Sequence, residues 1–322
     1  MGNNIFESLK KELPDIKKGI LLSDHTTFKI GGPAEYFLIA TKEKEIMHAI
    51  KTAKRLKIPI FVMGGGSNLL VSDNVIKGLV VKNQVIEPIV LIKNNIIEAP
   101  AGIVFGKLVN FSINKSLEGL EWAGGLPGTF GGAIRGNAGA FGGEIKDSVL
   151  KVRALDNKFN LKKLSNAQCK FAYRSSMFKQ ENWVVLSASV KLIKGDKKKI
   201  KEISNSHINY RREKHPLEYP NAGSIFKNVD FKEIPTKFQK LFLDKVKKDP
   251  FPIVPSAWFI IGAGLVGKKI GGAQISEKHS NYIVNLGGAK ALDVLKLIDI
   301  VKQKVKKKYN IKLETEIQFI GF

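Results

Sequence analysis

Glycine is concentrated in one stretch of the chain, and this stretch constrains the fold more than any other feature. Residues 124–143 read GGLPGTFGGAIRGNAGAFGG. Glycine loses more backbone freedom on folding than any other residue, but its backbone can turn with positive φ and approach a ligand closely. Apolar residues such as Phe130 and Ile134 interrupt the stretch, which is not typical of a flexible linker. We therefore interpret it as an ordered wrap around a large flat ligand. The alternative is a tight turn between buried strands.

A second glycine-rich segment, Gly64 to Asn68, reads GGGSN and follows an apolar run at 58–63 that predicts a buried strand. Backbone N–H groups of such a segment can bind a pyrophosphate. The Gly-Lys-Ser/Thr of a Walker sequence does not follow it. Phosphate binding is the interpretation that we favour, and a hairpin turn is the alternative.

The order of predicted elements indicates an α+β protein. A strand at 34–40, a helix at 46–56 and the strand at 58–63 form a unit that is typical of parallel strand pairs. Short strands and one helix then continue to about residue 195. A helix from Ile200 opens a second region, in which a long helix at 293–305 precedes an alternating pattern at 311–321 that predicts a final strand.

Composition excludes some classes of protein. The net charge of +24 over 322 residues would suit a nucleic-acid-binding protein, but the lysines are dispersed and no basic arm or zinc-finger spacing accompanies them. We therefore interpret the charge as a lysine-rich surface. Cys169 is the single cysteine, so an internal disulfide is excluded and a reducing, cytoplasmic location is expected. No apolar run approaches the ~20 residues that span a bilayer, so no membrane insertion is expected.

One motif is misleading. Gly262 to Gly267 matches the G-x-G-x-x-G pattern of dinucleotide-binding folds. That pattern should open a helix and precede an acidic residue by about 20 positions. Here Gly271 and Gly272 interrupt any helix, and Glu277 comes too early. We do not expect a dinucleotide at this motif.

Three polar side chains are candidates for chemistry. Arg174, among small and aromatic residues, suits a bidentate grip on a carboxylate, although a surface salt bridge is equally open. Ser224 follows a glycine in a turn and lacks the G-x-S-x-G context of a nucleophile, so it is a candidate proton donor or a simple turn serine. Glu316 lies in the predicted last strand on the same face as Glu314, where a surface role is the alternative.

The five histidines are expected to lie apart, and with one cysteine no metal site is expected. They are His25, His48, His207, His215 and His279.

At these residues the chain resembles the UDP-N-acetylenolpyruvoylglucosamine reductases, a family of flavoenzymes. The resemblance spans nearly the whole chain, and its segments occur in the family's order. These segments are residues 27–34, 64–69, 119–147, 173–176, 221–228, 270–281 and 316–321. The short span between Arg174 and Ser224 lacks an inserted tyrosine-bearing loop and resembles the second type of the family. Lys29 stands where many relatives have arginine.

The resemblance implies a fold and a domain order. The fold would be α+β, with an FAD-binding module of the vanillyl-alcohol-oxidase type followed by an α+β substrate-binding domain. The module would cover residues 1–200, in two subdomains at about 20–70 and 71–200. Residues 201–322 would form the substrate domain, and their last strand would return to the active site.

The resemblance also implies a reaction. NADPH would reduce non-covalently bound FAD, and the enolpyruvyl group of a UDP-sugar would then be reduced in cell-wall precursor synthesis. Arg174 and Glu316 would stabilise the enolate-like intermediate, and Ser224 would protonate it. A protonated Glu316, with a raised pKa, fits that role best. The rival functions are an FAD-dependent oxidase acting on another substrate and a basic nucleic-acid-binding protein.

The remaining site residues follow by position. FAD would contact Gly64, Gly65, Gly66, Ser67, Asn68, Pro127, Gly128, Gly131, Gly132, Asn137, Ala138 and Gly143. The substrate would contact Tyr173, Arg211, Lys214 and Asn228. No nucleic acid and no obligate protein partner is expected.

Overall fold

The computed structural model describes residues 2–322 and divides into two compact units. The N-terminal unit comprises the chain through Ile20, Ala34–Gly65 and Val75–Asn209, and the C-terminal unit comprises Leu21–Pro33, Gly66–Asn74 and Tyr210–Phe322. The expected boundary lay at 200–201. Two early segments group with the C-terminal unit because Phe28, Ile30 and Leu70 are buried in its core.

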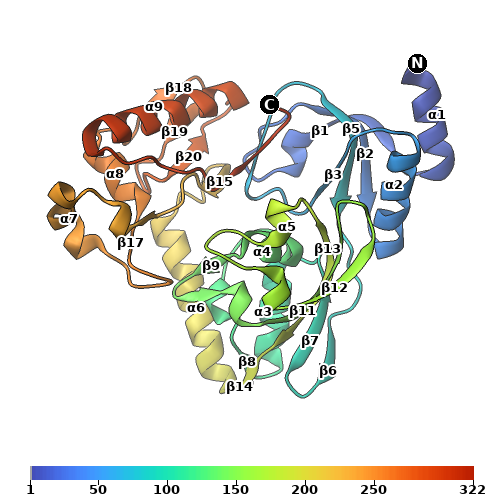
Figure 1. The fold of residues 1–322 in the computed structure, drawn as a ribbon, viewed down its shortest axis with the longest axis horizontal. Coiled ribbons are helices and arrows are strands. Elements are labelled where there is room, and N and C mark those ends of the chain that lie inside the picture. The colour runs from blue at the N-terminus through green and yellow to red at the C-terminus, as the bar shows by residue number, and fades with distance from the viewer. Residues whose placement is uncertain (1) are drawn as a thin grey trace. The chain divides into compact units, whose positions relative to one another are not determined.

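The first sheet of the N-terminal unit has four strands. Its order is β1 (Lys17–Leu21), β2 (Pro33–Ala40), β5 (Ile76–Asn83) and β3 (Ile60–Met63). The elements of the predicted strand–helix–strand unit are confirmed, with α2 at Glu43–Arg55 packed against β5 (Figure 1). However, β2 and β3 each pair in parallel with β5 and not with one another.

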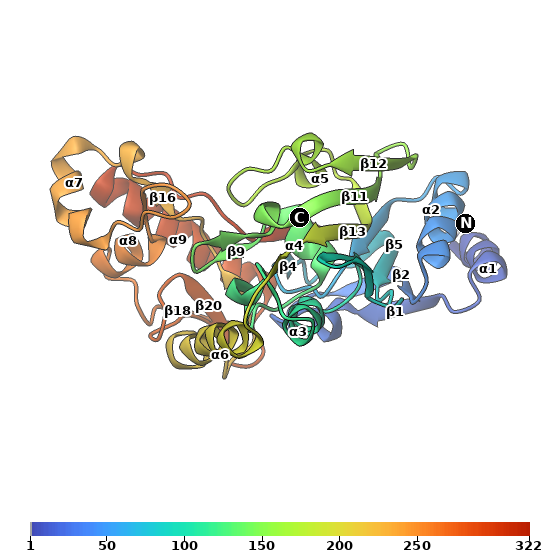
Figure 2. The ribbon, with the colours of Figure 1, turned by 90° about the horizontal axis from the view of Figure 1, so that it is seen from below.

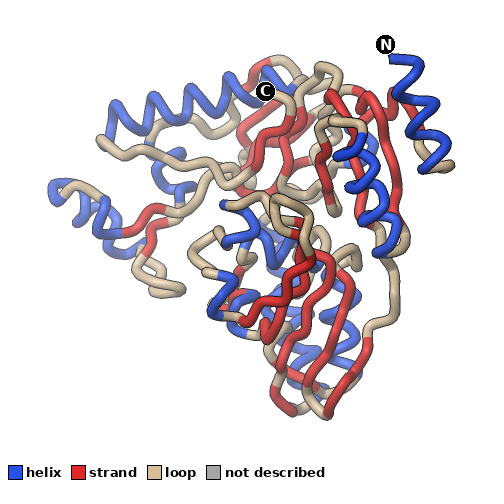
Figure 3. The backbone as a smooth tube through the Cα atoms, turned by 45° about the vertical axis from the view of Figure 1, so that its right-hand side comes forward, coloured by secondary structure: helices blue, strands red, loops and turns tan. Residues whose placement is uncertain are grey.

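The second sheet of this unit is antiparallel. Its order is β12 (Leu161–Ser165), β11 (Val149–Leu155), β13 (Val184–Lys191), β7 (Ile96–Pro100) and β6 (Val90–Lys93). Helix α4 packs against β13 and β7, and the strands of this sheet run side by side in Figure 3. The core beneath includes Phe105, Phe130 and Phe178, each fully buried. Phe130 is the first residue of α4, so the glycine-rich stretch is anchored in this core.

The other helices and strands that begin in the N-terminal unit lie outside these two sheets. They are α1 (Gly2–Glu12), α3 (Phe105–Asn114), α4 (Phe130–Gly136), α5 (Met177–Gln180), α6 (Lys197–Lys214), β8 (Leu117–Glu118), β9 (Gly139–Ala140), β10 (Gly143–Glu144) and β14 (Ile193–Lys194). Helix α6 continues past Asn209, so its last turn groups with the C-terminal unit. Figure 2 shows α6 and α3 nearly end-on.

The C-terminal unit is a four-stranded antiparallel sheet covered by helices. The sheet order is β15 (Asn221–Ser224), β20 (Tyr282–Asn285), β19 (Ala273–Ile275) and β18 (Lys269–Ile270). Helix α9 (Ala291–Tyr309) packs on β18 and β19 with its apolar face buried, and α8 (Ser256–Gly262) packs on α9. The other elements are α7 (Thr236–Phe242), β16 (Val229–Asp230), β17 (Ile253–Val254), β4 (Leu69–Val71) and β21 (Gln318–Ile320).

The structure settles the misleading glycine motif. Gly262 is the last residue of helix α8, so the motif follows a helix and not a strand. Gly264 and Gly267 have φ values of +69° and +74°, which are turn conformations. The motif therefore lacks the strand–turn–helix arrangement of a dinucleotide-binding fold.

The predicted final strand at 311–321 is wrong in extent. Only Gln318–Ile320 forms a strand, in parallel with β4, and Thr315 makes a single bridge with Phe226. Ile311, Leu313 and Ile317 are buried, so the alternation reflects burial of one face of an extended segment without a hydrogen-bonded ladder. Glu316 therefore lies just before the strand.

In the described part of the chain, no helix is long and apolar enough to cross a membrane.

Candidate active site

Within the N-terminal unit, Gly64 and Gly65 of the first glycine-rich segment meet the long glycine-rich stretch. A Cβ atom on Gly64 would lie 2.3 Å from the Oγ1 atom of Thr129, and one on Gly65 would lie 3.0 Å from the Cα atom of Gly128. A larger residue at position 64 or 65 would therefore collide with the long stretch, with the Thr129 side chain at Gly64 and with backbone at Gly65. Such a glycine-lined contact suits the phosphates of a dinucleotide, which backbone N–H groups can approach closely.

Other glycines of the long stretch are explained by packing. A Cβ on Gly131 would lie 2.6 Å from the Cβ of Ala101, and one on Gly143 would lie 2.4 Å from the Trp122 indole. By contrast, Gly132 is exposed, and the nearest atom to its Cβ position is 3.4 Å away. A ligand contact is thus geometrically open at Gly132, while packing alone accounts for Gly131 and Gly143.

Asn137 ends helix α4 in a left-handed conformation, with φ of 42°, and is fully buried. Its side-chain amide donates to the Ala172 carbonyl at 3.0 Å and accepts from the Lys146 N–H at 3.2 Å. These bonds hold the glycine-rich stretch against the segment that carries Arg174. Pro127 is exposed and Ala138 half-buried, and an FAD contact at each remains a prediction.

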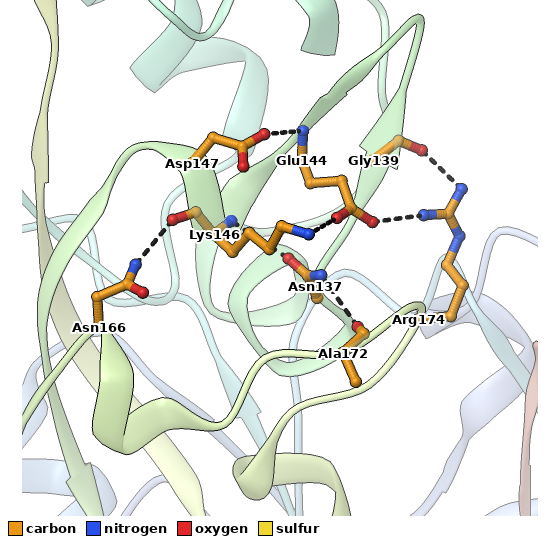
Figure 4. A network of polar contacts seen from close by, with 8 residues as sticks. All are labelled: Asn137, Gly139, Glu144, Lys146, Asp147, Asn166, Ala172 and Arg174. Atoms are coloured by element: carbon orange, nitrogen blue, oxygen red, sulfur yellow. Dashed lines mark hydrogen bonds and ion pairs between the residues drawn. The ribbon is translucent and has the colours of Figure 1, made fainter. Parts of the chain in front are cut away.

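Arg174 is held in a polar network of the N-terminal unit (Figure 4). Its Nη2 donates to the Gly139 carbonyl at 2.7 Å, and its Nη1 lies 3.9 Å from Oε1 of Glu144. The guanidinium also lies 4.9 Å from the ring centroid of Tyr173, which is a cation–π distance. Arg174 adopts φ of 53°, which is uncommon for a residue with a side chain. A surface salt bridge does not describe this constrained arginine.

Ser224 lies in the C-terminal unit at the end of β15, where it pairs with Tyr282 of β20. Burial raises the pKa of Tyr282 to about 12. The charge of Arg211 and a hydrogen bond from Ser224 oppose this rise, whereas the charge of Glu316 adds to it. The Tyr282 hydroxyl therefore stays protonated at neutral pH. Glu316 adjoins the same end of the sheet, because its N–H donates to the carbonyl of Ile225, the residue after Ser224.

His215 and His279 also adjoin Tyr282, so the expectation that the histidines lie apart is wrong for this pair. The His215 and His279 ring centroids are 5.4 Å apart, and Nδ1 of His215 lies 3.1 Å from the Tyr282 hydroxyl. His279 and Tyr282 are three residues apart in the sequence, whereas His215 lies far before both. The contact between His279 and Tyr282 is local, whereas the contact of His215 with both is long-range and could not be found from the pattern around His215.

Glu316 is half-buried and is fixed through its backbone. Its N–H donates to the Ile225 carbonyl at 2.8 Å, and its carbonyl accepts from the side-chain amide of Asn68 at 3.2 Å. Glu314, expected on the same face, instead pairs with Lys227 at 3.0 Å and is exposed. Asn68 thus joins the first glycine-rich segment to the residue before β21. Gly66 is required there, because its Cβ would lie 2.5 Å from the His25 carbonyl oxygen.

The predicted substrate residues differ in their surroundings. Arg211 is buried, and burial lowers its pKa, although Tyr282 and Tyr210 oppose this shift. Lys214 is exposed at the end of α6, and Asn228 accepts from the Ser256 N–H at 3.3 Å. Arg211 therefore belongs to the Tyr282 group, whereas the structure gives Asn228 a role in capping α8. Tyr173 is half-buried beside Arg174 in the N-terminal unit.

The histidine pair predicts a dependence of stability on pH. Burial first, then the charges of His279, Arg211, Lys278 and Lys247, lower the pKa of His215 to about 4, and burial also lowers that of His279. The unfolded chain, with histidine pKa near 6.5, therefore binds protons first as the pH falls, so stability declines from about pH 6.5 towards pH 4. Allowing for solvent screening, we expect His215 to contribute about 1 kcal/mol of this loss between pH 7.5 and 5.

Urea unfolding at both pH values tests this expectation in the wild type and in a His215→Gln variant. The variant should lose less stability between the two values. Equal losses in both proteins would show that His215 is not buried in its neutral form.

The family models match both parts of the chain. A model described as "FAD binding domain" matches residues 34–164, and one described as "UDP-N-acetylenolpyruvoylglucosamine reductase, C-terminal domain" matches residues 215–320. A protein of Caldanaerobacter subterraneus named UDP-N-acetylenolpyruvoylglucosamine reductase is 40% identical over 297 residues, which are 92% of this chain and 91% of that protein. The chain belongs to the UDP-N-acetylenolpyruvoylglucosamine reductase family. A protein of the same name from Clostridium tetani is 37% identical over 99% of this chain and 96% of its own length.

A solved structure agrees. The crystal structure of UDP-N-acetylenolpyruvylglucosamine reductase from Thermus caldophilus has a TM-score of 0.73 and 27% identity, over 95% of this chain and 99% of that one. The predicted family is confirmed: this reductase family member is an FAD-dependent oxidoreductase of mixed α and β structure. The vanillyl-alcohol-oxidase type of its FAD-binding module remains a prediction. The contacts of the individual site residues with FAD and substrate remain predictions.

Proposed function

We propose that the protein reduces the enolpyruvyl group of UDP-N-acetylglucosamine enolpyruvate to form UDP-N-acetylmuramate, with NADPH as reductant, in peptidoglycan precursor synthesis. The observation that carries this proposal is similarity along the whole length of relatives that bear the reductase name. The buried single cysteine agrees with a cytoplasmic location, which is part of the proposal.

FAD supplies the hydride chemistry when bound. The touching backbones at Gly65 and Gly128 would hold its phosphates, because they leave no space for a side chain. Gly132 would add a further contact in the N-terminal unit. Cys169 is buried and desolvation raises its pKa to about 12, so this thiol is a poor nucleophile and non-covalent binding is expected.

The protein side chains would manage the charge and the proton. Hydride addition to the double bond leaves negative charge on the adjacent carboxylate, and the Arg174 guanidinium suits its stabilisation. Ser224 would donate its proton to the carbon that carries the developing charge. Tyr282, opposite Ser224 in the sheet, would orient the serine hydroxyl. Glu316 would assist in its protonated form, and Arg211 and Lys214 would bind the anionic diphosphate of the UDP-sugar.

A single assay tests the proposed function. The purified protein should be yellow and should oxidise NADPH only when the enolpyruvyl UDP-sugar is added. The product should have the mass of the substrate plus two hydrogens. A yellow protein that oxidises another substrate with oxygen would support a flavin oxidase instead. A colourless protein that fails to take up FAD and binds DNA or RNA in a salt-sensitive manner would exclude the reductase.

A further inference from the structure

A buried carboxylate, Glu144, lies between the two cations nearest to it. Its side chain is 6% exposed, its Oε2 lies 2.5 Å from Nζ of Lys146, and its Oε1 lies 3.9 Å from Nη1 of Arg174 (Figure 4). We propose that Glu144 is a positioning residue that aims the Arg174 guanidinium at the substrate carboxylate, an inference that rests on the proposed function. The resemblance to the reductase family implied no role for Glu144.

The geometry restricts the guanidinium at several points. Nη2 is fixed by the Gly139 carbonyl at 2.7 Å, Nη1 faces the Glu144 carboxylate, and the plane lies near the Tyr173 ring. A Cβ on Gly139 would lie 2.7 Å from Cγ of Glu144 and 3.1 Å from Nη1 of Arg174. Glycine at position 139 is therefore required for the carboxylate and the guanidinium to occupy their places. The backbone of Arg174 is also confined, with φ of 53°.

Glu144 is itself held firmly enough to serve as an anchor. It lies on β10, which pairs with β9, and its N–H donates to Oδ2 of Asp147 at 2.9 Å. Lys146 follows in the next turn, and its N–H donates to the buried Asn137. Anchor and arginine thus belong to one network that also fixes the end of the glycine-rich stretch. Glu144 and Arg174 are 30 positions apart in sequence.

The charges leave Arg174 able to attract an anion. One negative charge on Glu144 stands against two positive charges, on Lys146 and Arg174, so the three residues sum to +1. Lys146, at the shorter distance, is the closer partner of the carboxylate. The longer separation from Arg174 orients the guanidinium by attraction, and an arginine fork is matched to a bidentate substrate carboxylate. A preorganised cation of this kind needs little rearrangement as charge develops.

Removing the charge of Glu144 should separate binding from chemistry. In Glu144→Gln the three residues sum to +2, so the substrate carboxylate should bind at least as tightly and KM for the UDP-sugar should stay level or fall. The guanidinium keeps its bond to the Gly139 carbonyl but loses the attraction that orients Nη1. We therefore expect kcat to fall about tenfold, less than the loss of a whole transition-state donor. Reduction of bound FAD by NADPH should keep its wild-type rate. A purely structural defect would instead lower flavin content or raise KM.

Two further variants complete the kinetic test. Glu144→Asp keeps the charge, so it should retain the wild-type KM and recover part of kcat. Glu181→Gln removes an exposed carboxylate elsewhere in the N-terminal unit and should match the wild type. An unchanged kcat in Glu144→Gln, or a raised KM with unchanged kcat, would overturn the role of Glu144.

A spectroscopic measurement tests the contact without turnover. The chain has six arginines, so arginine-selective ¹⁵N labelling of the FAD-bound protein should give few side-chain signals, with Arg174 assigned through an Arg174→Lys variant. We expect slow guanidinium rotation for Arg174 in the wild type and faster rotation in Glu144→Gln, in which the bond to the Gly139 carbonyl remains. Free rotation in the wild type would overturn the proposal. Failure of the wild type to reduce the UDP-sugar would refute the proposed function, whereas normal turnover with unaltered Arg174 signals in Glu144→Gln would refute only the positioning role.

Discussion

Replacement of Ser224 by alanine is expected to slow turnover of the enolpyruvyl UDP-sugar by about 10³-fold, within the 10²–10⁴-fold range typical of a positioned acid. Ser224 pairs with Tyr282 at the end of β15, where Glu316 and Arg211 also influence the tyrosine. Alanine removes the proton donor and leaves the strand pairing intact. Reduction of bound flavin by NADPH should continue at the wild-type rate, because that half-reaction requires no proton from the serine.

Stopped-flow absorbance of the flavin separates the two half-reactions. NADPH should bleach the flavin equally fast in wild type and Ser224→Ala, and addition of the UDP-sugar should restore the colour slowly in the variant alone. Ser206→Ala, at an exposed serine of α6, is the matched control and should behave as wild type. Loss of both half-reactions in Ser224→Ala would reject Ser224 as a specific proton donor. Rapid reoxidation would reject it as well.

The sequence predicted the positions of helices and strands better than it predicted which of them pair in a sheet. Apolar periodicity located β2, α2 and β3 with small shifts at their ends. It could not show that β5 lies between β2 and β3, because strand order depends on contacts across the chain. The same limit applies to the strand that was predicted at 311–321. Its alternating burial is genuine, but a ladder needs a partner strand, and only Gln318–Ile320 finds one in β4.

The candidate site shows the same division between local and long-range information. Residue type and local context marked Arg174 and Ser224 as candidates for chemistry. Their supporting residues lacked any local signal: Glu144 resembles an ordinary charged residue until its burial is known, and Tyr282 reads as one more apolar position of a strand. Residues that position others act through distance and burial, so they emerge from the three-dimensional structure.

A valine at position 65 is expected to weaken FAD binding by about 100-fold while the protein stays folded. A Cβ on Gly65 would already lie 3.0 Å from the Cα of Gly128 and 3.7 Å from the Thr129 nitrogen, and both neighbours are backbone. The branched side chain must push the two segments apart. Overpacking of this kind costs about 3 kcal/mol, which equals about 100-fold in affinity if the strain falls on the FAD-binding conformation. The φ angle of Gly65 is not in the left-handed region, so the effect arises from space and not from backbone strain.

Gly106→Val provides the matched control, because Gly106 lies in α3 and no atom stands within 4 Å of its Cβ position. Both variants should be purified, stripped of flavin and titrated with FAD by fluorescence quenching, and circular dichroism should confirm that each is folded. The control should bind FAD as the wild type does. Wild-type affinity in Gly65→Val would show that the contact between the two glycine-rich segments does not shape the FAD site. If Gly65→Val lost its structure, the contact would be needed for folding and not specifically for FAD binding.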